Sequence, residues 1–179
     1  MKLNARFTFL PIILFIIVSF SGKHSDKIQK KVTKEITSYF DTEDFSTAVV
    51  KISDVDNALV KAEFGKENLL SISGSDGLLG YAYIGNAPSK TATFDYLVIF
   101  DKDFVIATSK VLIYREEYGG EIGSKRWLKQ FIGKSKNDDV KFGENVDAIS
   151  GATISVRSMT NAISNLLKSM KILHQKEVI

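Results

Sequence analysis

Apolar residues recur at two different spacings along the chain, and the change of spacing separates two helical segments from a β-rich middle. From Asp26 to about Phe40, apolar positions three and four residues apart predict an amphipathic helix with lysine-rich outer faces. The same spacing from Ile154 to Leu173 predicts a second, longer helix. The apolar positions are Ile28, Val32, Ile36 and Tyr39/Phe40 in the first helix, and Val156, Met159, Ile163, Leu166, Leu167, Met170 and Leu173 in the second.

Short runs of β type fill the region between these helices. The candidate strands are residues 49–52, 69–73, 78–84, 93–100 and 104–114. Residues 60–64 are ambiguous, and the segment 85–89, which contains Gly85 and Pro88, is expected to break the third strand. Consecutive strands joined by short turns predict a twisted antiparallel sheet flanked by helices, an α+β fold. Without βαβ alternation or a G-x-G-x-x-G sequence, the chain is not a Rossmann-type protein.

The first residues have the features of an export signal. Lys2 and Arg6 precede the apolar run 7–20, and small residues at its end favour cleavage after Ser21. The run is shorter than the ~20 residues that span a bilayer comfortably, yet retention as an anchor is the alternative. We therefore divide the chain into three parts: 1–21, a signal peptide or N-terminal membrane anchor; 22–45, a linker and amphipathic helix; and 46–179, one folded domain.

The charge balance excludes one class of partner. Removing residues 1–21 takes away Lys2 and Arg6 and no acid, which leaves 22 cations against 21 anions. No run of Lys and Arg with interleaved aromatic residues is present, so the sequence predicts no nucleic-acid binding. The lysines of the first helix predict either a solvated face or a contact with anionic lipid; they are Lys27, Lys30, Lys31 and Lys34.

The absence of cysteine narrows the possible chemistry. It excludes disulfides, thiolate metal sites, the attachment of c-type haem and lipoprotein processing. The two histidines, His24 and His174, lie near opposite ends of the chain and predict neither a metal site nor a Ser-His-Asp arrangement. Redox chemistry in this chain would therefore need a cofactor other than thiol, iron–sulfur or covalently bound haem.

The stretch before the second helix combines a carboxylate, two hydroxyls and a glycine within seven residues, Asp147 to Thr153. Thr153 is expected at or just before the helix N-terminus, where unpaired backbone N–H groups and the helix dipole favour a phosphate. Gly151 and Ala152 carry little side-chain bulk and let a large ligand approach the backbone. The residues by themselves therefore predict an anion site beside a hydroxyl.

This stretch resembles the flavinylation motif of the FMN-binding domain family, found in the C subunit of sodium-translocating NADH:quinone reductase and the G subunit of Rnf complexes. In that family, Asp-x-x-(Ser/Thr)-Gly-Ala-Thr ends in the threonine that receives FMN through a phosphodiester bond. The resemblance implies that Thr153 carries FMN, and that Asp147, Ser150, Gly151 and Ala152 belong to the cofactor site. Residues 46–179 would then form an FMN-binding domain.

A second stretch of the resemblance precedes the motif. Family members have a loop of the type Glu-Thr-Pro-Gly-Leu-Gly followed by Trp and Phe, at the spacing of Trp127 and Phe131; here the loop lacks the Thr-Pro. Tyr118 is a candidate platform for the flavin ring, with Gly119 and Gly120 giving the ring edge access to backbone N–H groups. Trp127 and Phe131 are expected in the core, with a flavin contact as the alternative for Trp127. Leu79-Gly80-Tyr81 resembles a family strand, so the match is expected over roughly residues 68–170.

The resemblance implies an exported electron-transfer flavoprotein with FMN covalently attached to Thr153, a redox carrier or subunit of an oxidoreductase system rather than a stand-alone enzyme. Implied partners are a Mg²⁺-dependent flavin transferase that installs FMN from FAD and membrane or periplasmic redox partners. One alternative is a non-flavinylated extracytoplasmic binding or assembly domain, which would not need the intact sequence from Ser150 to Thr153. Another is a flavoenzyme with its own substrate, although the sequence shows no substrate domain.

Overall fold

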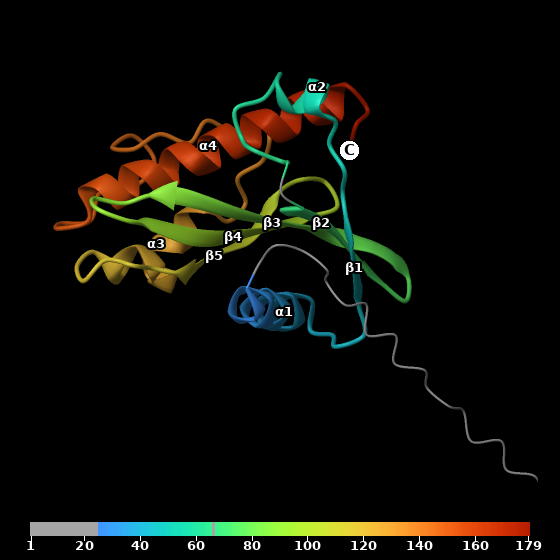
Figure 1. Cartoon of the computed structure of the whole chain (residues 1–179), viewed down its shortest axis with the longest axis horizontal. Coiled ribbons are helices and arrows are strands. Elements are labelled where there is room, and N and C mark those ends of the chain that lie inside the picture. Colours follow the sequence, from blue (N-terminus) through green and yellow to red (C-terminus); the bar gives the residue numbers. More distant parts are fainter. Residues whose placement is uncertain (1–24, 66) are drawn as a thin grey trace, which may run out of the picture.

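A computed structural model describes residues 25–65 and 67–179 and shows one antiparallel sheet between helices (Figure 1). The five strands lie side by side in the order β1-β2-β3-β4-β5. They are β1 (Ser46–Val49), β2 (Leu69–Gly74), β3 (Gly77–Pro88), β4 (Thr93–Asp101) and β5 (Ile106–Ile113). All four pairings are antiparallel, which confirms the α+β class expected from the sequence.

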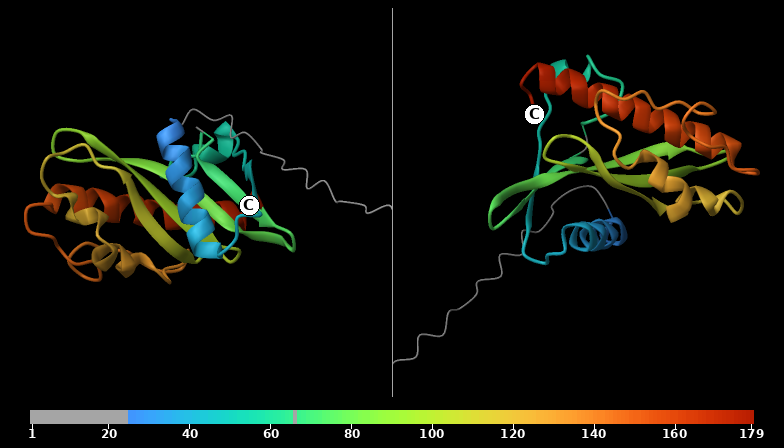
Figure 2. Two further views of the ribbon diagram at one scale, coloured as in Figure 1. Left: turned by 90° about the horizontal axis from the view of Figure 1, so that it is seen from below. Right: turned by 180° about the vertical axis from the view of Figure 1, so that it is seen from behind.

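Two long helices cover opposite faces of this sheet, as the two views of Figure 2 show. The two long helices are α1 (Asp26–Phe40) and α4 (Thr153–Gln175). The short helices are α2 (Asp54–Asn57) and α3 (Lys125–Leu128), and the 3₁₀ turns η1 (Gly120–Gly123) and η2 (Lys129–Phe131) lie on either side of α3. The predicted helices at both ends of the chain are confirmed. The predicted signal or anchor, 1–21, lies outside the described residues. Within 25–65 and 67–179, every helix is too short or too polar to cross a membrane.

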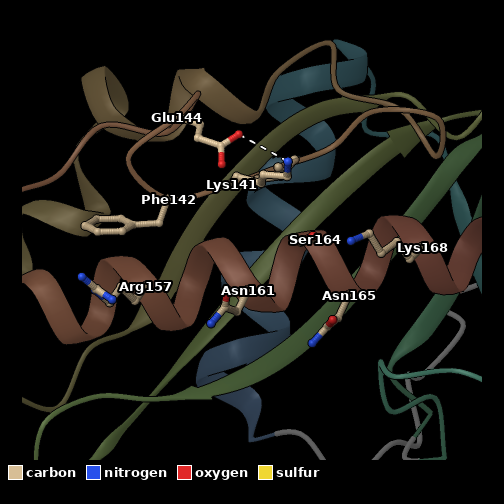
Figure 3. A pocket seen from close by; sticks show the side chains of 9 residues that line it. Lys141, Phe142, Glu144, Arg157, Asn161, Ser164, Asn165 and Lys168 are labelled. Atoms are coloured by element: carbon tan, nitrogen blue, oxygen red, sulfur yellow. Dashed lines mark ion pairs between the residues drawn. The ribbon is translucent and has the colours of Figure 1, made fainter.

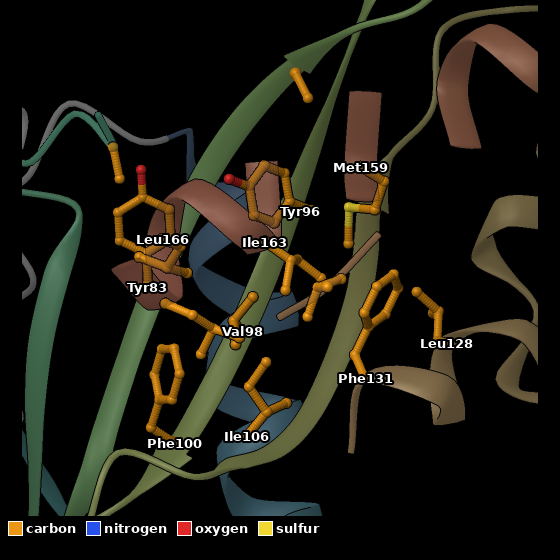
Figure 4. Packing of buried hydrophobic residues seen from close by; sticks show 14 of the residues in the cluster. Tyr83, Tyr96, Val98, Phe100, Ile106, Leu128, Phe131, Met159, Ile163 and Leu166 are labelled. Atoms are coloured by element: carbon orange, nitrogen blue, oxygen red, sulfur yellow. The ribbon is translucent and has the colours of Figure 1, made fainter. Parts of the chain in front are cut away.

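The alternating side chains of β4 build a separate core on each face of the sheet. Phe94, Tyr96, Val98 and Phe100 belong to the core under α4, while Leu97 and Ile99 belong to the core under α1. Figure 4 shows the α4 side, where Met159, Ile163 and Leu166 pack over these rings. Each such fully buried side chain stabilises the fold by about 1.5–3 kcal/mol, so α4 is held firmly along its length.

Helix α1 buries Ile28, Val32 and Ile36 against the sheet, as its periodicity predicts. Lys31 does not belong to a purely solvated face, because its ammonium donates a hydrogen bond to the main-chain oxygen of Leu112. Glu35 of the same helix pairs with Lys110 of β5 at 3.1 Å. These contacts fix α1 over the β5 side of the sheet.

The expected break of β3 at residues 85–89 is wrong, because the strand continues to Pro88. Position 85 leaves no space for a side chain, because a Cβ there would lie 2.2 Å from the ring of Tyr96 on β4. The Asn86 side chain donates to the Asp95 carboxylate at 2.7 Å and supports the pairing. Pro88 stands at the end of the ladder, where a missing N–H is tolerated.

The first strand also differs from the expectation. It covers Ser46–Val49 rather than residues 49–52, because its partner β2 begins at Leu69 and offers no ladder beyond that point. Residues 60–64 form no strand. Instead Ala62 and Phe64 pack into the core under α4, and the Ser169 hydroxyl of α4 accepts a hydrogen bond from Ala62 N at 3.0 Å.

Candidate functional site

The N-terminus of α4 presents an exposed hydroxyl at a positively polarised helix end. Thr153 is the first residue of the helix and its side chain is exposed. The preceding Ala152 offers no side-chain cap, and the first turn of α4 contains no acid. Gly151 has a φ of +81° and open space where a Cβ would stand, so this residue does not crowd the approach to the helix end. The backbone N–H groups of this first turn can therefore serve a bound anion.

A single tyrosine joins this helix end to the loop after β5. The Tyr114 hydroxyl lies 3.0 Å from the carbonyl oxygen of Tyr118 and 3.0 Å from the hydroxyl of Ser155, in the first turn of α4. A carbonyl only accepts, so the Tyr114 hydrogen goes to Tyr118 and the Ser155 hydroxyl donates to Tyr114. The loop is thereby held against the helix that begins at Thr153.

The lack of a side chain at Gly119 allows the loop to lie close to the start of the helix. Its φ is +83°, and a Cβ at this position would lie 2.8 Å from the Tyr114 hydroxyl and 3.1 Å from the Ala152 Cβ. Only glycine satisfies both the backbone conformation and the space. Gly120 has neither restriction, since a Cβ there would meet only a Tyr114 ring carbon at 3.9 Å. The neighbouring Tyr118 side chain is 81 % exposed beside this contact.

The same loop is tied at its other side to the β3–β4 hairpin through Glu116. The carboxylate of Glu116 accepts hydrogen bonds from Thr91 N at 2.6 Å, the Ser89 hydroxyl at 2.7 Å, the Thr91 hydroxyl at 2.9 Å and Ala92 N at 3.1 Å. These bonds lower the pKa of Glu116 to about 2, with the backbone bond from Thr91 as the largest cause. The carboxylate therefore stays ionised and keeps the loop in place at neutral pH.

Arg115 adds a second tie between this loop and β4. Its guanidinium donates to the Asp95 carboxylate at 2.5 Å and to the carbonyl oxygen of Thr93 at 3.1 Å. Side-chain contacts thus anchor the loop at three consecutive residues on the N-terminal side of Tyr118, namely Tyr114, Arg115 and Glu116. A loop with so many fixed points is preorganised for a ligand.

The other end of the motif is held through its backbone. The Trp127 indole N–H donates to the Asp147 carbonyl oxygen at 2.8 Å, and Asp147 N donates to the Gln130 side-chain oxygen at 2.9 Å. Trp127 and Phe131 are both buried, with their rings edge to face at 5.2 Å, as expected for core residues. Trp127 thus has a second role that the sequence did not reveal, namely to place the first residue of the motif.

The predicted site residues fall into three groups. Gly119 lies directly against Ala152, and the carbonyl oxygen of Tyr118 is held by the Tyr114 hydroxyl that also contacts Ser155. Ser150 and Gly151 are exposed on the turn that leads into α4, and the Asp147 side chain is exposed further along the same stretch. Gly120 follows at the start of η1, exposed and without a close neighbour on the helix.

Sequence reasoning missed an arginine one turn beyond Thr153. Arg157 of α4 is exposed, and its guanidinium lies 4.5 Å from the ring centre of Phe142, a cation–π contact between the helix and the 140–144 loop. Figure 3 shows it at one end of an open groove between the 140–144 loop and the outer face of α4. The spacing Thr153 to Arg157 is the available signal, since residues four apart share a helix face.

The charges of this groove are otherwise paired. Lys141 contacts Glu144 at 3.3 Å, and Lys168 contacts Asp139 at 3.7 Å. Asp138 accepts hydrogen bonds from the Ser135 hydroxyl and backbone N–H, and these bonds lower its pKa. In the part of the chain that the structure describes, no three His, Cys, Asp or Glu side chains gather to hold a metal ion.

These residues fit a phosphate that is linked to a flat, largely apolar group. An exposed hydroxyl stands at a helix N-terminus whose first turn contains no acid, and an arginine lies one turn away. The loop held against this helix end carries the exposed aromatic ring of Tyr118. Such an arrangement is typical of domains that carry a phosphate-bearing aromatic cofactor on a helix end. The fold and site therefore suit an α+β domain that binds such a cofactor.

The comparison with protein families identifies that cofactor. Residues 91–168 match the family model of the FMN-binding domain, which confirms the resemblance that the motif carries. The match supports a flavin-binding role of the electron-transfer type. It contains both the Tyr118 loop and the Thr153 motif, but it begins later than residue 68 and leaves out Leu79-Gly80-Tyr81. A search of curated proteins found no match to the chain.

Proposed function

We propose that this protein is an extracytoplasmic electron-transfer protein whose FMN is covalently attached through a phosphodiester to Thr153. One observation carries the proposal: the Tyr118–Gly120 loop is fastened beside the exposed threonine that begins α4, through Tyr114 and the close contact of Gly119 with Ala152. The family match gives the cofactor its identity. The helix N-terminus and Arg157 supply the positive potential that a phosphodiester on Thr153 requires.

Attachment is a group transfer that needs a second protein. In the proposed step, Thr153 Oγ1 forms a bond to the FMN phosphorus of FAD, the pyrophosphate P–O bond breaks, and AMP leaves. The hydroxyl proton passes to a base of a Mg²⁺-dependent flavin transferase. Thr153 makes no hydrogen bond to a carboxylate or a histidine within residues 25–65 and 67–179, which favours an external base over self-modification.

After attachment, the residues of this chain bind and orient. Bound FMN supplies reversible one- or two-electron chemistry. The α4 N–H groups and Arg157 would stabilise the phosphodiester charge, and the exposed ring of Tyr118 on the adjoining loop would offer an aromatic surface. The buried length of α4 keeps Thr153 fixed relative to the sheet. The domain thus carries the cofactor on a rigid support and passes electrons to membrane or periplasmic redox partners.

The location outside the cytoplasm is supported by the sequence pattern of residues 1–21, with two cations followed by an apolar run. It also agrees with the need for a transferase in the same compartment. We expect the chain to be found at the outer face of the cytoplasmic membrane or in the periplasm. Recovery of the protein from the cytosol, with an intact Met1, would refute this location.

Co-expression with a flavin transferase tests the proposal. The wild-type protein should give a flavin fluorescent band in a denaturing gel, and Thr153→Ala should abolish it while the protein remains folded. Ser155→Ala and Thr160→Ala serve as matched hydroxyl deletions on the same helix and should keep the band. A fluorescent Thr153→Ala protein, or a dark wild-type protein in the presence of an active transferase, would contradict the proposal.

A further inference from the structure

The outer face of α1 carries positive charge that nothing in the described structure neutralises. Lys27, Lys30 and Lys34, called here the lysine face, are exposed on the side of the helix opposite the buried Ile28, Val32 and Ile36. None of the three has an ion pair with a residue of 25–65 or 67–179. The lysine face is therefore a free cationic surface on a helix whose apolar side is already covered.

Neighbouring charges do not cancel this surface. Glu35 is turned towards Lys110 of β5, and Lys31 is used in its contact with Leu112. Asp26 starts the helix, where its charge complements the helix dipole. The further acids follow the last turn, at Asp41, Glu43 and Asp44. Positive charge thus concentrates on the first turns of α1, next to the predicted export segment.

The chain itself limits how far this surface can lie from a bilayer. The apolar run ends at Phe20 and α1 begins at Asp26, so residues 21–25 connect them. Five residues reach at most about 18 Å however they are arranged. The electrostatic attraction of a charged surface extends over about 8–10 Å at physiological salt. An N-terminal run retained in the membrane would therefore keep the start of α1 within about two screening lengths of the lipid surface.

We propose that the lysine face rests on the anionic headgroups of the membrane and thereby turns the flavin site towards the aqueous phase. The orientation follows from the fold, because α1 and α4 cover opposite faces of the sheet (Figures 1 and 2). The proposal rests on the proposed location of the domain and on retention of residues 1–21 as an anchor. Redox partners would then approach Thr153 from the water side, with the sheet between them and the lipid.

The thickness of the molecule keeps the α4 side beyond the range of the lipid charge. An α-helix is about 10 Å across, and packed layers lie about 10 Å apart, so the α4 side stands roughly 20 Å or more from lipid that contacts α1. This separation exceeds the range of the surface potential. Lipid charge should therefore change the orientation of the domain without changing the reduction potential of the attached flavin.

The full chain lacks cysteine, so a single introduced cysteine can report this contact. Ser38→Cys lies one turn after Lys34 on the exposed side of α1, and Asn161→Cys lies on the exposed side of α4. Each variant is labelled with a fluorophore and reconstituted in vesicles of phosphatidylcholine alone or of equal parts phosphatidylcholine and phosphatidylglycerol. A quencher attached to lipid headgroups then reports which label lies at the surface.

The Ser38 label should be quenched in the anionic vesicles, less so in high salt, and only weakly in phosphatidylcholine. The Asn161 label should stay unquenched throughout. Each lysine near an anionic surface changes binding about fivefold, so Lys27→Gln, Lys30→Gln and Lys34→Gln together should lower the ratio of docked to undocked domain roughly 100-fold. Lys125→Gln, Lys129→Gln and Lys171→Gln remove the same charge from exposed positions elsewhere and should have no such effect.

Three results would overturn the lipid contact: equal quenching in both kinds of vesicle, full quenching after the three α1 lysines are neutralised, or failure of the full chain to float with vesicles. Quenching of Ser38 in native membranes but not in pure lipid would assign the surface to a protein partner instead. Fluorescence of the attached flavin in a denaturing gel is read on the same samples. Loss of that band with normal quenching would refute flavinylation alone, and the reverse result would refute the lipid contact alone.

Discussion

The two adjacent glycines of the loop have different roles at the scale of single residues. From the sequence, both glycines are expected to give the flavin ring access to backbone N–H groups, whereas the structure gives a positive φ and a close neighbour to Gly119 only. Gly119 faces Ala152 and the Tyr114 hydroxyl, whereas the space next to Gly120 is open. Sequence reasoning could not separate them, because the distinction depends on a helix more than thirty residues further along the chain.

Substitution by alanine should therefore separate the two glycines. Gly119→Ala combines a strained backbone with an overlap against Tyr114, and we expect a loss of about 1–3 kcal/mol in the free energy of unfolding. Gly120→Ala should stay within about 0.5 kcal/mol of the parent. Urea unfolding followed by tryptophan fluorescence measures both, since Trp127 is the single tryptophan. Equal destabilisation by the two variants would show that the close contact at Gly119 is unimportant.

Between elements, the Tyr114 hydroxyl joins the loop to the first turn of α4. Tyr114→Phe removes the bonds to Tyr118 and Ser155 and should cost about 1–2 kcal/mol of unfolding free energy. Ser155→Ala removes one of these bonds, so the double variant should lose less than the sum of the single ones. Tyr39→Phe, at an exposed position of α1, is the matched control and should be neutral. Strict additivity would mean that Tyr114 and Ser155 do not interact.

The Glu116 carboxylate links the same loop to the β3–β4 hairpin and makes that link depend on pH. Its folded pKa, about 2, is below the ordinary value of 4.5, so its contribution to stability is present above pH 4.5 and disappears as the pH falls towards 2. Glu116→Gln should lower the unfolding midpoint in urea at pH 7, and the difference from the parent should shrink through this window. Glu117→Gln, the next residue, provides the control. A difference that stayed constant down to pH 2 would argue against the carboxylate as its source.

The sequence predicted the elements whose signal is local. The periodicity of α1 and α4 and the hairpin of β4 and β5 depend on neighbours within a few residues, and all were found. The continuation of β3 was missed because Gly85 makes room for the ring of Tyr96, a contact between strands. The motif predicted Thr153 as a site residue, but it did not predict the contacts that surround it. Tyr114 and Ser155 are 41 positions apart in the sequence, and Trp127 and Asp147 are 20 positions apart.

At the scale of the whole molecule, the sheet separates the surface that carries Thr153 from the surface that carries the lysine face. The core under α4 fixes the helix that begins with Thr153, and the core under α1 fixes the helix that carries the lysine face. Since β4 contributes side chains to both cores, the two surfaces keep a constant relation to each other. A cofactor on one surface and a membrane contact on the other would thus be held at a fixed distance.

The central claim is the covalent bond between FMN and Thr153, and peptide mass mapping tests it most directly. Wild-type protein co-produced with a flavin transferase is digested with trypsin, which releases residues 142–157 as one peptide, between Lys141 and Arg157. The account predicts that this peptide gains the mass of one FMN less one water, and that its fragment ions place the gain on Thr153. An unmodified peptide, or a gain located on Ser150 or Ser155, would contradict it.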